Sequence, residues 1–280
     1  GSLRQPNGLV DPKSYERTLQ SLYEIAYSAD LGVRLIGDQQ LNLADPAGFA
    51  ADHPALILHA YAASDALLTF ARDYAAAGGR LILPPRTGYV RDDGVMRTEV
   101  APAGFVEILG ASYNEYSNLN EPLQALDTDG NLVGAAYGWI DQLELDTDSH
   151  ATVLARLDHP FFGDFSAVIE APHGNGSVTY LASYPDAALG QWLGARLARQ
   201  LGHEQPVVSV ASSVITNRAK TAEGRDVFFV FNWSWNTTEA TVISISNRPS
   251  AAIDLLTGER FEAGQRFGLS AWGVRVLLVD

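Results

Sequence analysis

The residues in this 280-residue chain that most resemble a catalytic motif are Asn120-Glu121-Pro122, with Asn114-Glu115 just before them. A glutamate at such a turn could serve in glycoside hydrolysis, which in its retaining form needs two carboxyl groups about 5 to 5.5 Å apart. The preceding residues, 113–119, are polar and do not form the apolar strand that would aim Glu121 into a barrel. We therefore expect Glu121 not to be catalytic.

The sequence also lacks the residue patterns that other kinds of catalytic or metal site require. The chain has no cysteine, which excludes disulfides, thiolate metal sites and cysteine nucleophiles. The six histidines are scattered and no glycine pattern typical of phosphate binding occurs. Residues 127–131 (DTDGN) fit a solvated hairpin turn better than a calcium loop, and residues 268–272 (GLSAW) lack the second glycine of a serine nucleophile elbow. We predict no catalytic residue, cofactor or metal site.

Two tryptophans, Trp233 and Trp235, are spaced so that an extended strand would place both on one face. An exposed pair could stack on sugar rings. Large aromatic side chains in a β-sandwich more often fill the core or a domain interface, and we favour this alternative.

Composition limits the partners and the location. Lys and Arg number 19 against 33 Asp and Glu, a net charge of −14 that repels phosphate backbones and anionic lipid surfaces. We therefore expect no nucleic-acid or membrane partner. The longest apolar runs are too short to span a bilayer, no leader opens the chain, and the absence of cysteine favours the cytoplasm. Gly1-Ser2 is typical of a protease-cleavage scar, so the chain is expected to be part of a longer protein.

The first 200 residues alternate helix and strand signals. We expect a helix over 12–29, a strand over 33–36 and an apolar strand over 55–60. A helix capped by Ser64 should run to Ala77, before a strand at 80–83. This strand–helix–strand order predicts a parallel sheet covered by helices.

The middle of the chain should add a short helix over 105–109 stopped by Gly110 and a hairpin around Asp129-Gly130. Further strands are expected at 152–157, 167–171 and 178–183, followed by a helix over 185–201.

After Gln205-Pro206 the sequence changes to short β-prone runs, which predict a small antiparallel sandwich. The expected strands are 207–210, 227–232, 240–245, 252–256 and 274–279. We accordingly divide the chain into a scar and linker (1–11), an α/β domain (12–205) and a C-terminal β-sandwich (206–280).

Residues 55–119 contain an apolar strand, a Ser-capped helix, a Gly-Gly-x-Leu strand, a Thr-Gly loop and a Leu-Gly segment, in that order. This order of motifs resembles the trimerisation domain of glycoside hydrolase family 42 β-galactosidases. Residues 167–187 (AVIEAPHGNGSVTYLASYPDA) also resemble the family, and residues 230–233 with 254–259 (DLLTGE) are similar to its final β-sandwich. The ordered series covers roughly residues 12 to 280.

This resemblance implies an α/β domain like class I glutamine amidotransferases and a terminal sandwich, without the (β/α)8 barrel that holds the catalytic glutamates of the family. Amidotransferase activity is not expected, because residues 84–88 (PPRTG) offer no cysteine after the strand. The implied function is non-catalytic assembly of a homotrimer, with the barrel as a partner in the same polypeptide. The alternatives are a carbohydrate-binding module and an α/β domain that is itself a small hydrolase or amidotransferase relative.

For the trimer contact we select the loop after the 80–83 strand, because functional surfaces of α/β folds gather at the carboxyl ends of the strands. Its candidate interface residues are Arg86, Thr87, Tyr89 and Arg91.

Overall fold

The computed structural model describes residues 11–41, 43–203, 207–208, 211, 213–242 and 251–279. The chain divides into two compact units, one formed by residues 1–25 and 35–193 and the other by 26–34 and 194–280. The boundary predicted between residues 205 and 206 lies outside the described residues.

The first unit is a mixed α/β structure around a nine-stranded sheet in the order β1-β2-β10-β9-β8-β5-β6-β11, with β4 also paired to β6. The strands are β1 (Ala55–Ile57), β2 (Arg80–Leu83), β4 (Tyr116–Ser117), β5 (Leu123–Asp127), β6 (Leu132–Asp141), β8 (Thr152–Leu157), β9 (Ser166–His173), β10 (Gly176–Leu181) and β11 (Ser183–Pro185). Strands β1 and β2 run parallel, as predicted; β10 also pairs with β2 in parallel, and the remaining pairs are antiparallel. The predicted parallel sheet is therefore continued by antiparallel strands.

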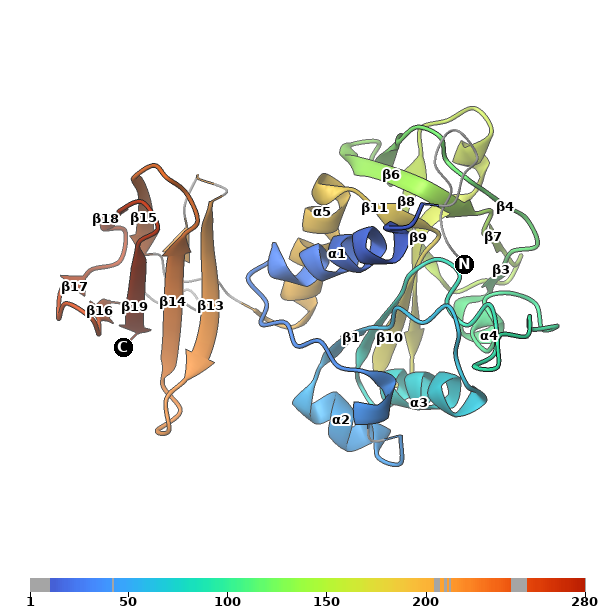
Figure 1. Cartoon of the computed structure of the whole chain (residues 1–280), viewed down its shortest axis with the longest axis horizontal. Helices are drawn as coiled ribbons and strands as arrows, with labels where there is room; N and C mark the ends of the chain where they lie inside the picture. Colours follow the sequence, from blue (N-terminus) through green and yellow to red (C-terminus); the bar gives the residue numbers. More distant parts are fainter. Residues whose placement is uncertain are drawn as a thin grey trace. The chain divides into compact units, whose positions relative to one another are not determined.

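Helices cover both faces of the parallel strands. They are α1 (Ser14–Tyr27), α2 (Pro46–Asp52), α3 (Asp65–Ala76), α4 (Val106–Leu109) and α5 (Ala187–Gln200), with short 3₁₀ turns at η1 (Asp38–Gln40) and η2 (Phe162–Asp164). Helices α2 and α3 lie on one side of β1 and β10, and α1 and α5 on the other (Figure 1). No helix among the described residues is long and apolar enough to cross a membrane.

Helix α3 supplies much of the core of this unit. Its Ser64 N-cap accepts a hydrogen bond from the Leu67 amide, as the sequence predicts, and its apolar residues recur at helical spacing. Phe70 and Tyr74 are fully buried against the sheet residues Leu81 and Val178. Because this core fixes α3 on β2, it also fixes the loop that follows β2.

Several expectations for this unit are confirmed and one is wrong. Helix α4 ends at Gly110, which has a left-handed φ of 54°. The hairpin between β5 and β6 turns at Asp129-Gly130, where Asp127 accepts backbone hydrogen bonds from Asp129 and Asn131. The strand expected at 33–36 is absent, since these mostly exposed residues pair with no neighbouring strand. A small sheet of β3 (Ala111–Ser112) and β7 (Glu144–Leu145) was not predicted.

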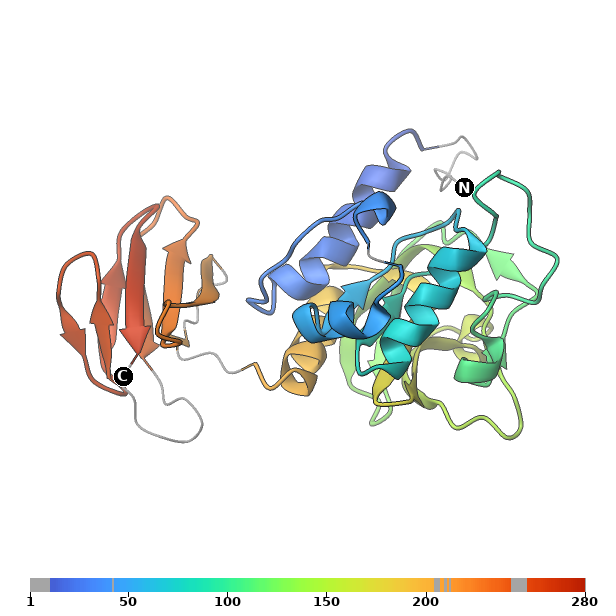
Figure 2. The ribbon, with the colours of Figure 1, turned by 90° about the horizontal axis from the view of Figure 1, so that it is seen from below.

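From β12 onward the second unit is built of strands (Figure 2). One sheet has the order β13-β14-β19-β16-β17 and the other β12-β15-β18. The strands are β12 (Val207–Val208), β13 (Val214–Lys220), β14 (Asp226–Asn232), β15 (Thr238–Val242), β16 (Ala252–Asp254), β17 (Arg260–Phe261), β18 (Arg266–Leu269) and β19 (Val274–Val279). All their pairings are antiparallel, which confirms the predicted antiparallel β region, and Phe228, Val230, Phe267 and Leu277 belong to its core.

Candidate functional site

The loop after β2 contains Arg86, which has a positive φ of 63°. A non-glycine residue in this region is uncommon, and the strain must be offset by surrounding contacts. The guanidinium carbon of Arg86 lies 4.2 Å from the ring centre of Trp139 and 4.7 Å from that of Tyr61. Such stacking of a cation on aromatic faces stabilises a desolvated side chain. Arg86 is therefore an internal support of the loop.

Asp141, the last residue of β6, is hydrogen-bonded to the same loop. Its carboxylate is fully buried and accepts hydrogen bonds from the backbone amide of Arg86 (3.0 Å), the indole of Trp139 (2.8 Å) and the hydroxyl of Tyr180 (2.6 Å). Burial raises the pKa of Asp141 to about 6, although these hydrogen bonds favour the charged form.

Aromatic rings extend this cluster to the surface. Tyr89 stacks on Tyr61 with ring centres 5.7 Å apart, and Tyr116 stacks on Trp139 at 4.7 Å. Tyr89 and Tyr116 meet edge to face at 6.2 Å, and Tyr116 is exposed. The buried end of the cluster is thus held by several contacts, while its outermost ring, Tyr116, is exposed.

The four candidate contact residues have different environments. Arg86 and Thr87 are buried, and the Thr87 hydroxyl donates to the Pro84 carbonyl oxygen at 2.7 Å. Tyr89 is half-buried and Arg91 is exposed. A contact role for Arg86 and Thr87 does not fit their burial, because both side chains are engaged inside the unit.

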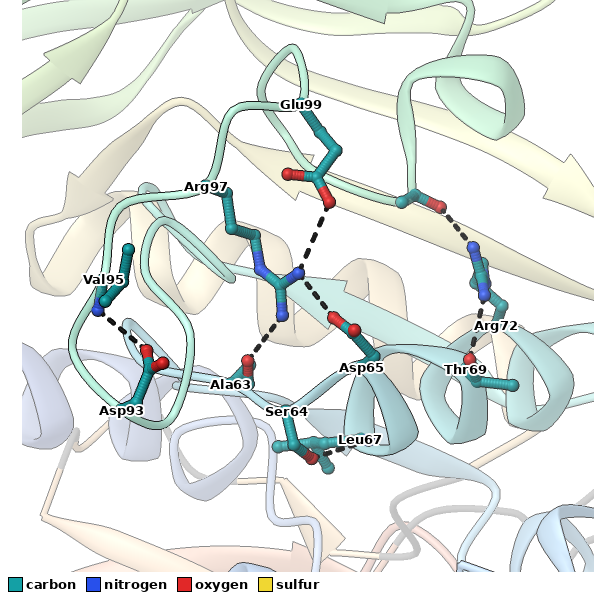
Figure 3. A network of polar contacts seen from close by, with 11 residues as sticks. Ala63, Ser64, Asp65, Leu67, Thr69, Arg72, Asp93, Val95, Arg97 and Glu99 are labelled. Atoms are coloured by element: carbon teal, nitrogen blue, oxygen red, sulfur yellow. Dashed lines mark hydrogen bonds and ion pairs between the residues drawn. The ribbon is translucent and has the colours of Figure 1, made fainter.

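Beyond Arg91, a second arginine fixes the segment of residues 91–100. The Arg97 side chain is only 4% exposed and forms a 2.6 Å ion pair with Asp65 at the start of α3 (Figure 3). It also donates to the Ala63 carbonyl oxygen at 2.6 Å, while Glu99 lies 3.7 Å away. The hydrogen bond from Arg97 lowers the pKa of Asp65. Arg97 was not selected from the sequence, since its partners lie more than thirty residues earlier in the chain.

The segment of residues 91–100 exposes apolar side chains to solvent. Val95, Met96 and Val100 are all more than half exposed. The backbone between them is ordered by hydrogen bonds, including Arg91 to Val95 (2.8 Å) and Val95 to the Asp93 carboxylate (2.9 Å). We name Tyr89, Arg91, Val95, Met96 and Val100 the β2–α4 patch. Apolar groups held in this way are typical of an interaction surface.

The remaining candidates lie elsewhere. Glu121 is exposed in the residues before β5. Trp233 and Trp235 are 53% and 82% exposed, so they do not fill the core of the second unit, the first of the two places that we favoured. Strand β14 ends at Asn232, and the chain bends there instead of carrying the two rings into the core. Within the described residues, no group of three His, Asp or Glu side chains is placed to hold a metal ion.

Residues 7–204 match the family model described as the β-galactosidase trimerisation domain. The chain belongs to this family. Among curated proteins, β-galactosidase BgaA of Clostridium cellulovorans is 29% identical over 123 residues, which are 44% of this chain and 18% of BgaA. This chain therefore spans only a small part of that relative.

Solved structures agree in fold over almost the whole chain. The family 42 β-galactosidase Gan42B of G. stearothermophilus matches with a TM-score of 0.78 at 18% identity, covering 96% of this chain and 37% of Gan42B. The β-galactosidase of Bacillus circulans sp. alkalophilus gives 0.76 at 19% identity, covering 95% and 38%. That of the haloarchaeon Halorubrum lacusprofundi gives 0.71 at 18% identity, covering 96% and 36%. The chain thus spans under two fifths of each structure.

Proposed function

We propose that this chain is the assembly region of a β-galactosidase. In this proposal its α/β domain (12–205) joins three copies, its β-sandwich (206–280) follows, and a barrel domain of the same polypeptide hydrolyses terminal β-D-galactosides. The match of residues 7–204 to the trimerisation domain is the observation that carries the proposal. A cytoplasmic location is part of it, supported by the absence of cysteine.

The proposed α/β domain is of the class I glutamine amidotransferase type, supported by the parallel strands β1, β2 and β10 and the crossover helix α3. In other α/β folds a strained turn after a strand carries the nucleophile. Here the strained residue after β2 is Arg86, whose guanidinium is not a nucleophile and is stacked on aromatic rings. The same turn thus supports a surface instead of a reaction.

We place the contact between copies at the β2–α4 patch. Its apolar side chains are exposed in the single chain, Arg97 ties the segment 91–100 to α3, and Asp141 accepts a hydrogen bond from the Arg86 amide earlier in the same loop. A preordered surface loses less conformational entropy on association. Three identical copies joined head to tail form a closed ring, in which this patch meets a different surface of the next copy.

Substitution of Met96 tests this placement. Met96→Glu puts a charge at the centre of an apolar contact, so we expect the trimer to dissociate to monomers in sedimentation at micromolar concentration. Leu132→Glu is the matched control, because Leu132 is equally exposed in the same unit but lies at the β5–β6 hairpin. A Met96→Glu chain that remains trimeric would remove the patch from the interface.

A further inference from the structure

Three tryptophans gather at one end of the second unit. Trp233 and Trp235 follow β14, and Trp272 precedes β19; the three are 53%, 82% and 50% exposed. The ring of Trp272 meets Trp233 edge to face at 6.1 Å and Trp235 at 5.2 Å. We call these residues the tryptophan platform. They are three of the five tryptophans in the chain, and such a concentration of exposed aromatic surface marks a binding site.

A buried amide holds the two loops of the platform together. Asn232 is 1% exposed, and its side-chain nitrogen donates to the carbonyl oxygens of Asn236 (2.7 Å) and Ser270 (2.9 Å). Its side-chain oxygen accepts from the Ser213 hydroxyl at 3.0 Å. Because a buried amide satisfied in this way rigidifies its surroundings, the three rings are preorganised.

The backbone of Trp272 adopts a strained conformation. Its φ is 54°, in the left-handed region, although half of its side chain faces solvent. The Trp272 amide donates to the Ser234 carbonyl oxygen at 3.0 Å, which fixes the ring beside the other loop. Strain of this kind persists where the surrounding structure enforces it, and it clusters at binding sites.

The two chain segments that carry the platform contain no charged residue. No Asp, Glu, Lys or Arg occurs in residues 227–238 or 267–274, although 52 of the 280 residues are charged. Hydroxyl and amide side chains flank the rings instead, and Asn236, Thr237 and Ser270 are exposed. A ligand that fits this surface combines a flat apolar face with neutral hydrogen-bonding groups.

A pyranose ring has both features, because its C–H groups form an apolar face and its hydroxyls lie at the rim. We propose that Trp233, Trp235 and Trp272 bind a neutral hexopyranose unit of an oligosaccharide by stacking. Nucleic acid bases also stack, but their phosphates are repelled by the net charge of −14. This site is independent of the proposed assembly function.

Calorimetric titration of the full chain with galactotetraose, a neutral probe, tests the proposal. An open platform of this size should bind with a Kd of about 1 mM. Trp235→Ala should weaken binding about tenfold or more, and Trp235→Phe by less, because a smaller ring keeps part of the stacking surface. Trp235 is almost fully exposed, so neither change should disturb folding.

Phe161→Ala is the matched control, because Phe161 is an exposed aromatic residue of the first unit, and it should bind as the parent does. No binding at about 50 mM probe, far above the expected Kd, would overturn the proposal, as would equal affinity of parent and Trp235→Ala. A change of solution mass caused by Trp235→Ala would overturn it too, since the ring would then pack between copies. A monomeric chain that binds the probe would refute only the assembly proposal.

Discussion

Arg86 and Asp141 are two buried charged residues that stabilise the loop after β2. The aromatic faces of Tyr61 and Trp139 cover the cation, and the carboxylate is held by a backbone amide, an indole and a phenol. Burial of a carboxylate disfavours its charged form, and this effect exceeds that of the hydrogen bonds. The sequence offered one signal for Asp141, an acidic residue that ends the largely apolar run 132–140.

The raised pKa of Asp141 predicts a pH dependence of stability. Between the ordinary pKa of 3.8 and about 6, the folded chain binds more protons than the unfolded chain. The contribution of this group to the free energy of unfolding is therefore complete below pH 4 and is lost as pH rises to about 6, a change on the order of 3 kcal/mol. In urea unfolding, the free energy of unfolding of the parent should decline relative to that of Asp141→Asn as pH rises through this range.

Asp141→Asn should be less stable throughout, because its amide nitrogen faces groups that are themselves donors. The variant should also lack the decline in stability with rising pH that the Asp141 carboxyl causes. Asp129→Asn, in the exposed β5–β6 turn, is the control, and its free energy of unfolding should depend on pH as that of the parent does. Parallel curves for the parent and Asp141→Asn would show that Asp141 does not titrate in this window.

Arg97 is predicted to control the mobility of the β2–α4 patch. Arg97→Met removes the ion pair with Asp65 and the hydrogen bond to Ala63, so the segment 91–100 should open more often. Limited trypsin digestion should then cleave after Arg91 roughly tenfold faster, if these contacts contribute about 1.4 kcal/mol to closure. Arg72→Met, which removes contacts to Thr69 and Gly104 only, should digest at the parental rate. Equal rates for Arg97→Met and the parent would contradict this role.

At the level of helices, strands and turns, the sequence predicts those features that depend on contacts between residues close together in the chain. The Ser64 cap, the Gly110 stop and the Asp129-Gly130 turn each act within a few residues, and each is where the sequence placed it. Strand β13 was missed because its outer half is polar and exposed. The contacts of Arg97 with Asp65 and Ala63 were missed for another reason, since they join residues that only the folded α/β unit brings together.

Gly134 in β6 lies so close to α5 that a larger residue there should destabilise the fold. Its φ is 141°, and a Cβ built there would overlap the backbone of Leu189 in α5. Gly134→Ala should therefore lower the free energy of unfolding by about 3 kcal/mol, measured by urea denaturation. Gly130→Ala is the control, because Gly130 also has a positive φ but open space around its Cα; it should cost only about 1 kcal/mol. Equal losses would show that strain, and not the approach of α5, determines the effect.

At the scale of the whole molecule, two compact units share one chain, and the trimerisation-domain match covers residues 7–204. The resemblance noted in the sequence predicted this family, because an ordered series of motifs survives where overall identity to solved structures is only 18 to 19%. The exposure of the tryptophans was not predictable in this way, since it depends on where β14 ends.

Light scattering of the unaltered chain over a range of concentrations tests the assembly proposal most directly. We expect a species of three times the chain mass that persists on dilution into the micromolar range, because contacts within the single chain already hold the segment that carries the patch. A strict monomer at all concentrations would contradict the claim that this region carries the trimer contact.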